Sequence, residues 1–193
     1  FSFEGFHTRG GLTDVHRDGW GIAFFEGERG LRHFVDHESA SESPVAALIR
    51  ALARYRQQTG LDPTQAMQEQ ALANNTKIAA LILAFFKARF DPHLPETMDT
   101  RIARSSKLEF MIESKLTEVV SLDEDRALRR ISQLVKAIRR TNYYQSGPDR
   151  DPKSYMSFKI DSNAVAELPA PKPYREIWVA SPQVEGVHLR FGP

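Results

Sequence analysis

Apolar residues recur at three- and four-residue spacing through the middle of the chain, and this spacing predicts a run of helices. Residues 45–55 are helical in pattern, and residues 66–86 carry a long apolar face that ends before Asp91. A further helix is predicted over residues 100–120, with its buried side formed by Leu108, Ile112, Leu116 and Val119. Helices of this length can bury one another.

Capping residues mark two of the helix starts. Asp62 followed by Pro63 predicts an N-cap and a proline in the first turn. Ser121 and Glu124 have the spacing of a capping box. The helix that follows this box is predicted to bury Leu128, Ile131, Leu134, Val135 and Ile138.

The two ends of the chain have the pattern of strands. Residues 20–25 form an apolar run, and residues 31–35 follow after a glycine-containing loop, which predicts a hairpin. After Gly147 the chain is punctuated by prolines, with strands predicted over residues 155–160, 176–180 and 187–191. The predicted fold class is α+β: an N-terminal β-hairpin, a central helical layer over 61–145, and short, mostly antiparallel C-terminal strands over 153–193.

Composition changes this picture little. Of 193 residues, 41% are hydrophobic and 26% are charged, which is ordinary for a globular protein. The 26 lysines and arginines nearly balance the 25 acids, so we expect no nucleic-acid partner. No apolar stretch reaches the roughly 18 residues of a membrane span. We therefore expect no membrane partner and a cytoplasmic location.

One helix is locally basic. Its neighbours Asp123, Glu124 and Asp125 favour a solvated helix face, and a phosphate or RNA patch is the less favoured alternative. The basic residues are Arg126, Arg129, Arg130, Lys136, Arg139 and Arg140.

The chain has no cysteine and does not begin with methionine. The absence of cysteine excludes disulfides, thiolate metal sites and a thiol nucleophile within these residues. A start at Phe1 indicates a fragment or a processed product.

A carboxylate–imidazole–carboxylate pattern stands near the N-terminus. Asp14, His16 and Asp18 alternate, so on an extended strand they would point to one side and could hold a metal or act as a general base. A solvated strand entry is the favoured interpretation, because no further ligand is fixed by the sequence. We predict no metal site.

The strings FSFEGFHTRGG and HRDGWGIAFFEG give the first 50 residues a resemblance to class II glutamine amidotransferases. In that family an N-terminal cysteine attacks the glutamine amide, with its own α-amino group as base. The resemblance implies that the strand entry forms the substrate pocket, at His16, Arg17, Asp18, Gly19, Trp20 and Gly21. The nucleophile would precede Phe1 and the oxyanion-hole segments do not follow Arg50, so glutamine hydrolysis is not expected.

Residues 51–193 resemble the large bacterial NAD-specific glutamate dehydrogenases, in the segment that leads into their catalytic core. Three blocks in the family order carry the resemblance: SLDEDRALRRISQLVKAIRRTNYYQ, YMSFKID and LPAPKPYREIWVASPQVEGVHLR. The family reaction is the oxidative deamination of glutamate to 2-oxoglutarate and ammonia. In the family, the strand matching residues 187–190 leads into a segment rich in glycine and arginine that binds the glutamate carboxylate, with the catalytic lysine and aspartate and the NAD fold further on.

The candidate groups of this second part lie on its last strand. His188 and Arg190 are two residues apart and share a strand face, so the resemblance implies a place at the edge of a substrate pocket. The favoured alternative makes Arg190 and Glu185 solvated charges and His188 a packed edge residue. The chain contains no G-x-G-x-x-G turn. We expect NAD in the full-length family, but no cofactor and no catalytic residue in this chain.

Three functions remain open. The first is a partial glutamate dehydrogenase polypeptide, inactive by itself, and the second is a remnant of an amidotransferase. The third is a non-enzymatic helical interaction module that could form a homo-oligomer. Glutamate or glutamine is the substrate that the two families imply. The junction near Arg50 could be natural or could be a frame or assembly junction.

Overall fold

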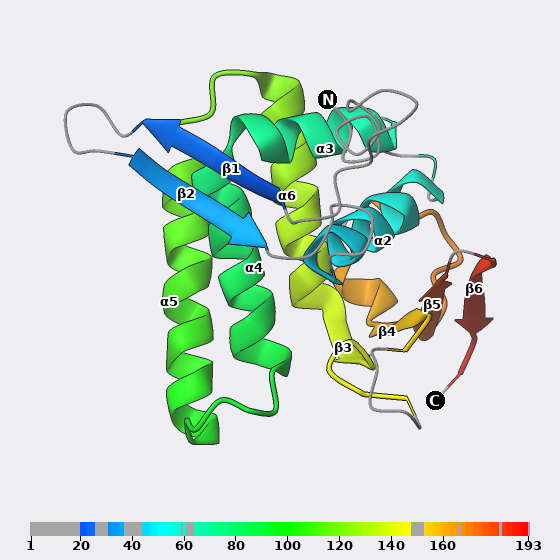
Figure 1. The fold of residues 1–193 in the computed structure, drawn as a ribbon. Coiled ribbons are helices and arrows are strands. Elements are labelled where there is room, and N and C mark those ends of the chain that lie inside the picture. Colours follow the sequence, from blue (N-terminus) through cyan, green and yellow to red (C-terminus); the bar gives the residue numbers. More distant parts are fainter. Residues whose placement is uncertain are drawn as a thin grey trace, which may run out of the picture.

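A computed structural model describes residues 20–25, 31–36, 44–58, 60, 64–147, 153–165, 167–181 and 183–192, with side chains described from residue 45 onward. Within this part, five α-helices and a four-stranded antiparallel sheet confirm a mixed α+β fold (Figure 1). The helices are α2 (Pro44–Gln58), α3 (Gln65–Asn74), α4 (Thr76–Phe90), α5 (Met98–Leu116) and α6 (Leu122–Ala137).

The sheet is a meander in which each strand pairs with the next one in sequence. Its order is β3 (Ile138–Thr141), β4 (Met156–Ile160), β5 (Arg175–Ala180) and β6 (Glu185–Arg190), and all pairs are antiparallel. A short 3₁₀ turn, η2 (Ser162–Ala164), follows β4. A separate two-stranded ladder joins β1 (Trp20–Phe25) and β2 (Leu31–Asp36), also antiparallel.

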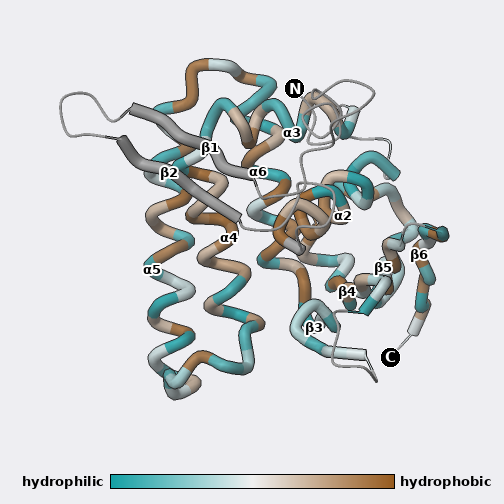
Figure 2. Tube along the Cα trace, in the orientation of Figure 1, coloured by the Kyte–Doolittle hydropathy of each residue, from teal (hydrophilic) through white to brown (hydrophobic). Residues whose placement is uncertain are grey.

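Helix α6 lies at the centre of the helical layer and contacts α2, α3, α4 and α5. Hydrophobic residues recur along its tube in Figure 2. All five residues predicted for its buried side are buried: Leu128, Ile131, Leu134, Val135 and Ile138. On α5, Ile112 and Leu116 are buried as predicted, with Leu108 and Val119 packed against the same core.

The predicted single helix over residues 66–86 is wrong, because α3 and α4 meet at a break at Asn75. Asn75 has φ −120° and ψ 55°, and its side-chain amide donates to the Ala71 carbonyl at 2.9 Å. An asparagine that bonds backbone in this way competes with the helical ladder. The N-cap of α3 is Thr64, which accepts from the Met67 amide, and the predicted cap Asp62 lies outside the described residues.

Only half of the predicted capping box forms. Ser121 is the N-cap of α6 and accepts from the Glu124 amide at 3.4 Å. The Glu124 carboxylate accepts instead from the side chains of Asn74 at 2.6 Å and Asn75 at 2.9 Å. The acid therefore ties the start of α6 to the break between α3 and α4.

Strand β3 falls inside the stretch predicted to be helical up to residue 145. Helix α6 ends at Ala137, and Ile138 takes extended angles with ψ 130° and starts the strand without a loop. Arg89 of α4 donates to the carbonyls of Val135 and Ile138, and the Asp161 amide donates to the Ala137 carbonyl at 3.0 Å. These donors satisfy carbonyls that the ending helix leaves free.

One helix crosses the position at which the two sequence resemblances meet. Helix α2 runs through Arg50 without interruption, as residues 45–55 predicted. Its buried side chains include Leu48 before that position and Leu52 and Tyr55 after it. Residues on both sides of Arg50 therefore belong to one hydrophobic core.

Candidate functional site

His188 and Arg190 lie on the outer face of the sheet, on edge strand β6. In the antiparallel register His188 stands opposite Ile177, and Arg190 stands opposite Arg175. Their neighbour on the inner face, Trp178, is fully buried. Both His188 and Arg190 are exposed, so the interpretation of His188 as a packed residue is wrong.

Glu185 is not brought together with these two residues. It begins β6 on the alternate face and forms an ion pair with Arg54 of α2. The Glu185 carboxylate therefore links β6 to α2, and it does not face the same side of the sheet as His188 and Arg190.

The inner face of the sheet carries a buried polar cluster that sequence reasoning missed. The Trp178 indole N–H donates to the Ala51 carbonyl at 2.9 Å, and the Tyr55 and Trp178 rings lie 6.1 Å apart. The Tyr55 hydroxyl donates to the buried carboxylate of Glu176. Burial, and then this carboxylate, raise the pKa of Tyr55 far above its ordinary value. The phenol therefore stays protonated and fixes α2 against β5.

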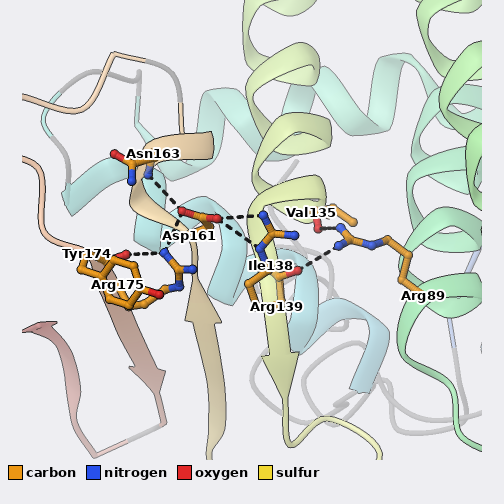
Figure 3. A network of polar contacts seen from close by, with 8 residues as sticks. All are labelled: Arg89, Val135, Ile138, Arg139, Asp161, Asn163, Tyr174 and Arg175. Atoms are coloured by element: carbon orange, nitrogen blue, oxygen red, sulfur yellow. Dashed lines mark hydrogen bonds and ion pairs between the residues drawn. The ribbon is translucent and has the colours of Figure 1, made fainter. Parts of the chain in front are cut away.

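A second polar network surrounds Asp161, the residue after β4, and joins it to β3 and β5 (Figure 3). The Arg139 guanidinium donates to Oδ2 at 2.7 Å, and Arg175 donates to Oδ1 at 3.1 Å. The Asn163 amide also donates to Oδ1, as expected where Asp161 caps η2. The hydrogen bond from Arg139, followed by the charge of Arg175, lowers the pKa of Asp161 below its ordinary value. This ionised carboxylate is suited to holding structure and not to general acid chemistry.

Replacing Asp161 by asparagine should weaken the acid sensitivity of the fold. The folded pKa lies below the unfolded one, so the carboxylate stabilises the fold above the unfolded pKa of about 3.9. That contribution is lost as the pH falls through the folded pKa. Urea unfolding of both proteins from neutral pH downward should show a stability difference that shrinks in acid. A difference that stays constant across the series would contradict this assignment.

A cleft of about 760 Å³ opens between α4, α5 and α6, beside the loop that follows η2. Its basic lining residues are Arg89, Arg101, Lys136, Arg139 and Lys172, against the single lining carboxylate of Glu109. These cations come from separate elements, so only the folded chain brings them together.

The amidotransferase-like positions lie mostly beyond what the structure describes. His16, Arg17, Asp18 and Gly19, together with Asp14, fall outside the described residues. Trp20 and Gly21 begin β1, with backbone partners Asp36 and Val35. Among the described side chains no three metal-ligating residues come together, and no helix in that part is long and apolar enough to cross a membrane.

The described residues do not fit NAD. A dinucleotide site needs a glycine-rich turn between a strand and the start of a helix. Strands β3 to β6 follow one another with only η2 between them. The segment between β2 and α2, residues 37–43, contains no glycine. No step of hydride transfer is assigned to these residues.

Two models of glutamate dehydrogenase regions match the chain in family order. "Glutamate dehydrogenase, helical motif 3" matches residues 43–92, and "Bacterial NAD-glutamate dehydrogenase, catalytic domain" matches residues 111–193. The NAD-specific glutamate dehydrogenase of Pseudomonas aeruginosa is 45% identical over 146 residues, 76% of this chain. Residues 51–193 resemble the bacterial NAD-specific glutamate dehydrogenases. The Mycobacterium tuberculosis enzyme of the same name is 36% identical over 148 residues.

The chain spans about 9% of the length of these dehydrogenases. The matched catalytic-domain region contains the end of α5, α6 and the whole four-stranded sheet. The matched helical motif contains α2, α3 and α4. The helices and the sheet that pack into one core here therefore match two glutamate dehydrogenase regions in family order.

The front of the chain resembles a different family. The model "Glutamine amidotransferases class-II" matches residues 1–61. A proposed glutamine amidotransferase of Haemophilus influenzae is 64% identical over 50 residues, which are 26% of this chain and 17% of the relative. A proposed amidotransferase of Escherichia coli, YafJ, is 50% identical over 50 residues. Both resemblances predicted from the sequence are confirmed, and their matched ranges overlap over residues 43–61.

Proposed function

We propose that this chain is a partial NAD-dependent glutamate dehydrogenase polypeptide. The whole enzyme would deaminate glutamate oxidatively to 2-oxoglutarate and ammonia, and this chain alone would be inactive. The observation that carries the proposal is the order of the two matched glutamate dehydrogenase regions within one core, together with 45% identity over 146 residues. The hydrogen bond from Trp178 to Ala51 links the sheet of one region to the helix of the other.

The proposed role of the sheet is to present the edge of the glutamate site. His188 and Arg190 point away from the buried Trp178 side, and both are exposed. Arg190 carries a guanidinium suited to a carboxylate. Arg175, opposite it on the next strand, is already bonded to Asp161. NAD would bind to parts of the full-length enzyme that this chain does not contain.

A chimera tests this function. Residues 51–193 of this chain would replace the matching segment of the Pseudomonas aeruginosa enzyme, and NADH formation from glutamate would be followed. We expect kcat/KM within about tenfold of the parent, a loss of at most about 1.4 kcal/mol in transition-state stabilisation. Arg190→Ala in the chimera should raise KM for glutamate more than it lowers kcat.

The control for the chimera is Lys107→Ala, an exposed change on α5 far from the sheet in sequence. It should leave both kinetic constants unchanged. A chimera that folds, as judged by circular dichroism and cooperative melting, but forms no NADH would contradict the proposed function.

A remnant of a class II glutamine amidotransferase is the second candidate, supported by the 64% identity over the first part of the chain. Its proposed pocket is the set of six residues from His16 to Gly21. Ammonia release from glutamine above a heat-inactivated sample would favour it over the dehydrogenase. With no cysteine in the chain, such activity would require a different nucleophile.

A non-enzymatic interaction module is the third candidate. It would act in the cytoplasm and could assemble as a homo-oligomer. The exposed apolar side chains of α5, Ile102 and Phe110, support it. The division at Arg50 into residues 1–50 and 51–193 stays a prediction under all three candidates.

A further inference from the structure

The cleft between α4, α5 and α6 concentrates positive charge in a volume suited to a small molecule. About 760 Å³ lies within the range of roughly 300 to 1,000 Å³ that is typical of ligand sites. Five basic side chains line it against one carboxylate, although the whole chain is nearly neutral. A cleft lined by charge of one sign raises the local concentration of ions of the opposite sign.

Three of these cations have no carboxylate partner among the described residues. Arg89 donates to the carbonyls of Val135 and Ile138, Arg101 donates to that of Ala88 at 3.0 Å, and Lys172 donates to that of Val165 at 3.3 Å. Neutral carbonyls orient these groups without cancelling their charge. An arginine has five N–H donors and a lysine three, so each group keeps donors for a ligand.

The other two cations are paired with acids. Lys136 bonds Glu109 across the cleft, and Arg139 bonds Asp161 on the side of the sheet. Lys136 of α6 is exposed, as predicted for a solvated helix face. Arg139 is also exposed, but it lies in β3, so its prediction as a helix residue is wrong. The structure adds that they share one concave surface with Arg89, a residue 47 positions before Lys136 in sequence.

Arg89 carries an electrostatic cost that an anion would relieve. Burial, and then the positive charge of Arg139, lower the pKa of Arg89, and the negative charge of Glu109 offsets part of this effect. Its guanidinium lies 5.5 Å from the Phe85 ring centroid and 5.1 Å from that of Phe90. Figure 3 shows Arg89 and Arg139 on either side of the Ile138 backbone. A negative ligand group near both would offset their repulsion.

Helices α4 and α5 contribute apolar as well as charged side chains to the cleft. Met98 and Ile102 of α5 line the cleft and are 69% and 58% exposed, and the buried Phe85 of α4 also lines it. Ser105 and Ser106 add hydroxyls on the same helix. A ligand with anionic groups and an organic ring matches this combination better than an inorganic ion does.

We propose that this cleft binds a phosphate-bearing small molecule of the nucleotide class. Arg89, Arg101 and Lys172 would receive the phosphates, because guanidinium and ammonium groups are the usual phosphate donors of proteins. The apolar side chains of Met98 and Ile102 would contact the base. This site is separate from the glutamate and NAD chemistry proposed above, and its presence does not depend on that function.

The test is calorimetric titration of the full chain with ATP, with inorganic triphosphate and with adenosine, at about 0.05 M salt where such pairs are weakly screened. We expect ATP to bind at least about tenfold more tightly than triphosphate, and adenosine not to bind measurably. Arg101→Ala with Lys172→Ala should weaken ATP binding at least about tenfold. The matched control is Lys87→Ala with Lys107→Ala, which removes the same charge from exposed positions outside the cleft and should leave Kd unchanged.

Two further variants separate binding from folding. Glu109→Gln should tighten ATP binding, because it removes the only carboxylate among the described lining residues and releases Lys136. Ser106→Glu adds a negative charge at an exposed position on the cleft and should weaken binding. The proposal is overturned if ATP does not bind, if adenosine binds as well as ATP, or if the cleft and control variants lose affinity equally.

Discussion

Trp178→Ala lowers the free energy of unfolding by about 3 to 5 kcal/mol, the usual cost of emptying a large buried aromatic site. Trp178 is fully buried on the inner face of β5, between the helical layer and the sheet. The substitution leaves a cavity and also removes the indole donor from the Ala51 carbonyl. Urea unfolding followed by far-ultraviolet circular dichroism measures the change without relying on tryptophan emission.

Trp178→Phe separates these two losses. Phenylalanine keeps most of the ring but not the hydrogen bond, so it should cost less than alanine and still leave a buried carbonyl without its donor. Val184→Ala is the control, because Val184 is 64% exposed and should change stability by no more than about 0.5 kcal/mol. Equal stability of Trp178→Ala and the unmodified chain would mean that the sheet does not pack on α2 through this residue.

Leu48→Ala should cost about 2 to 5 kcal/mol, as much as Leu134→Ala at the centre of α6. Both leucines are almost completely buried and belong to the same core cluster. Leu48 precedes Arg50, where the two sequence resemblances meet, and Leu134 follows it by a long stretch of chain. Comparable losses of unfolding free energy, measured in one cooperative transition, would show that the core includes residues on both sides of Arg50.

The result that would contradict this is a Leu48→Ala variant with an unchanged free energy of unfolding and a Leu134→Ala variant with a lowered one. That pair of results would separate the first turns of α2 from the folding unit and support a boundary at Arg50. Ile49, only partly buried on the same helix, supplies a third variant that should fall between exposed and core positions.

The sequence pattern correctly predicted those elements that depend on residues nearby in the chain. The apolar spacing of α6 and the Ser121 cap were predicted correctly, because helix periodicity and capping are decided within a few residues. The break at Asn75 was missed, since its apolar neighbours continue the helical period. The hydrogen bonds that stabilise the break, to Ala71 and Glu124, include one to a residue 49 positions away.

Strand β3 was missed for a related reason. Ile138 continues the apolar face of α6, so periodicity assigned it to the helix. Its extended backbone depends on pairing with Ile160 of β4 and on the donors from Arg89. Tertiary contacts therefore decided where the helix ends.

The candidate sites show the same limit. The strand alternation placed His188 and Arg190 on one face, and the register confirms that shared face. The Tyr55 to Glu176 bond joins residues 121 positions apart, and the basic cleft draws on four separate parts of the chain. Residues so far apart in sequence come together only in the folded chain. For the Tyr55 cluster, the one available signal was Glu176, an acid at an inward-facing position of β5.

The direct passage from α6 into β3 has a mechanical consequence. Ala137 ends the helix and Ile138 begins the strand, so no linker separates the two elements, and the register of β3 against β4 shifts between Ile138 and Arg140. Any rotation of α6 about its axis would change the direction of β3 and, through the ladder, of β4 and β5. A displacement of the helical layer would therefore reach the outer face of the sheet, where His188 and Arg190 lie, as a rigid-body tilt.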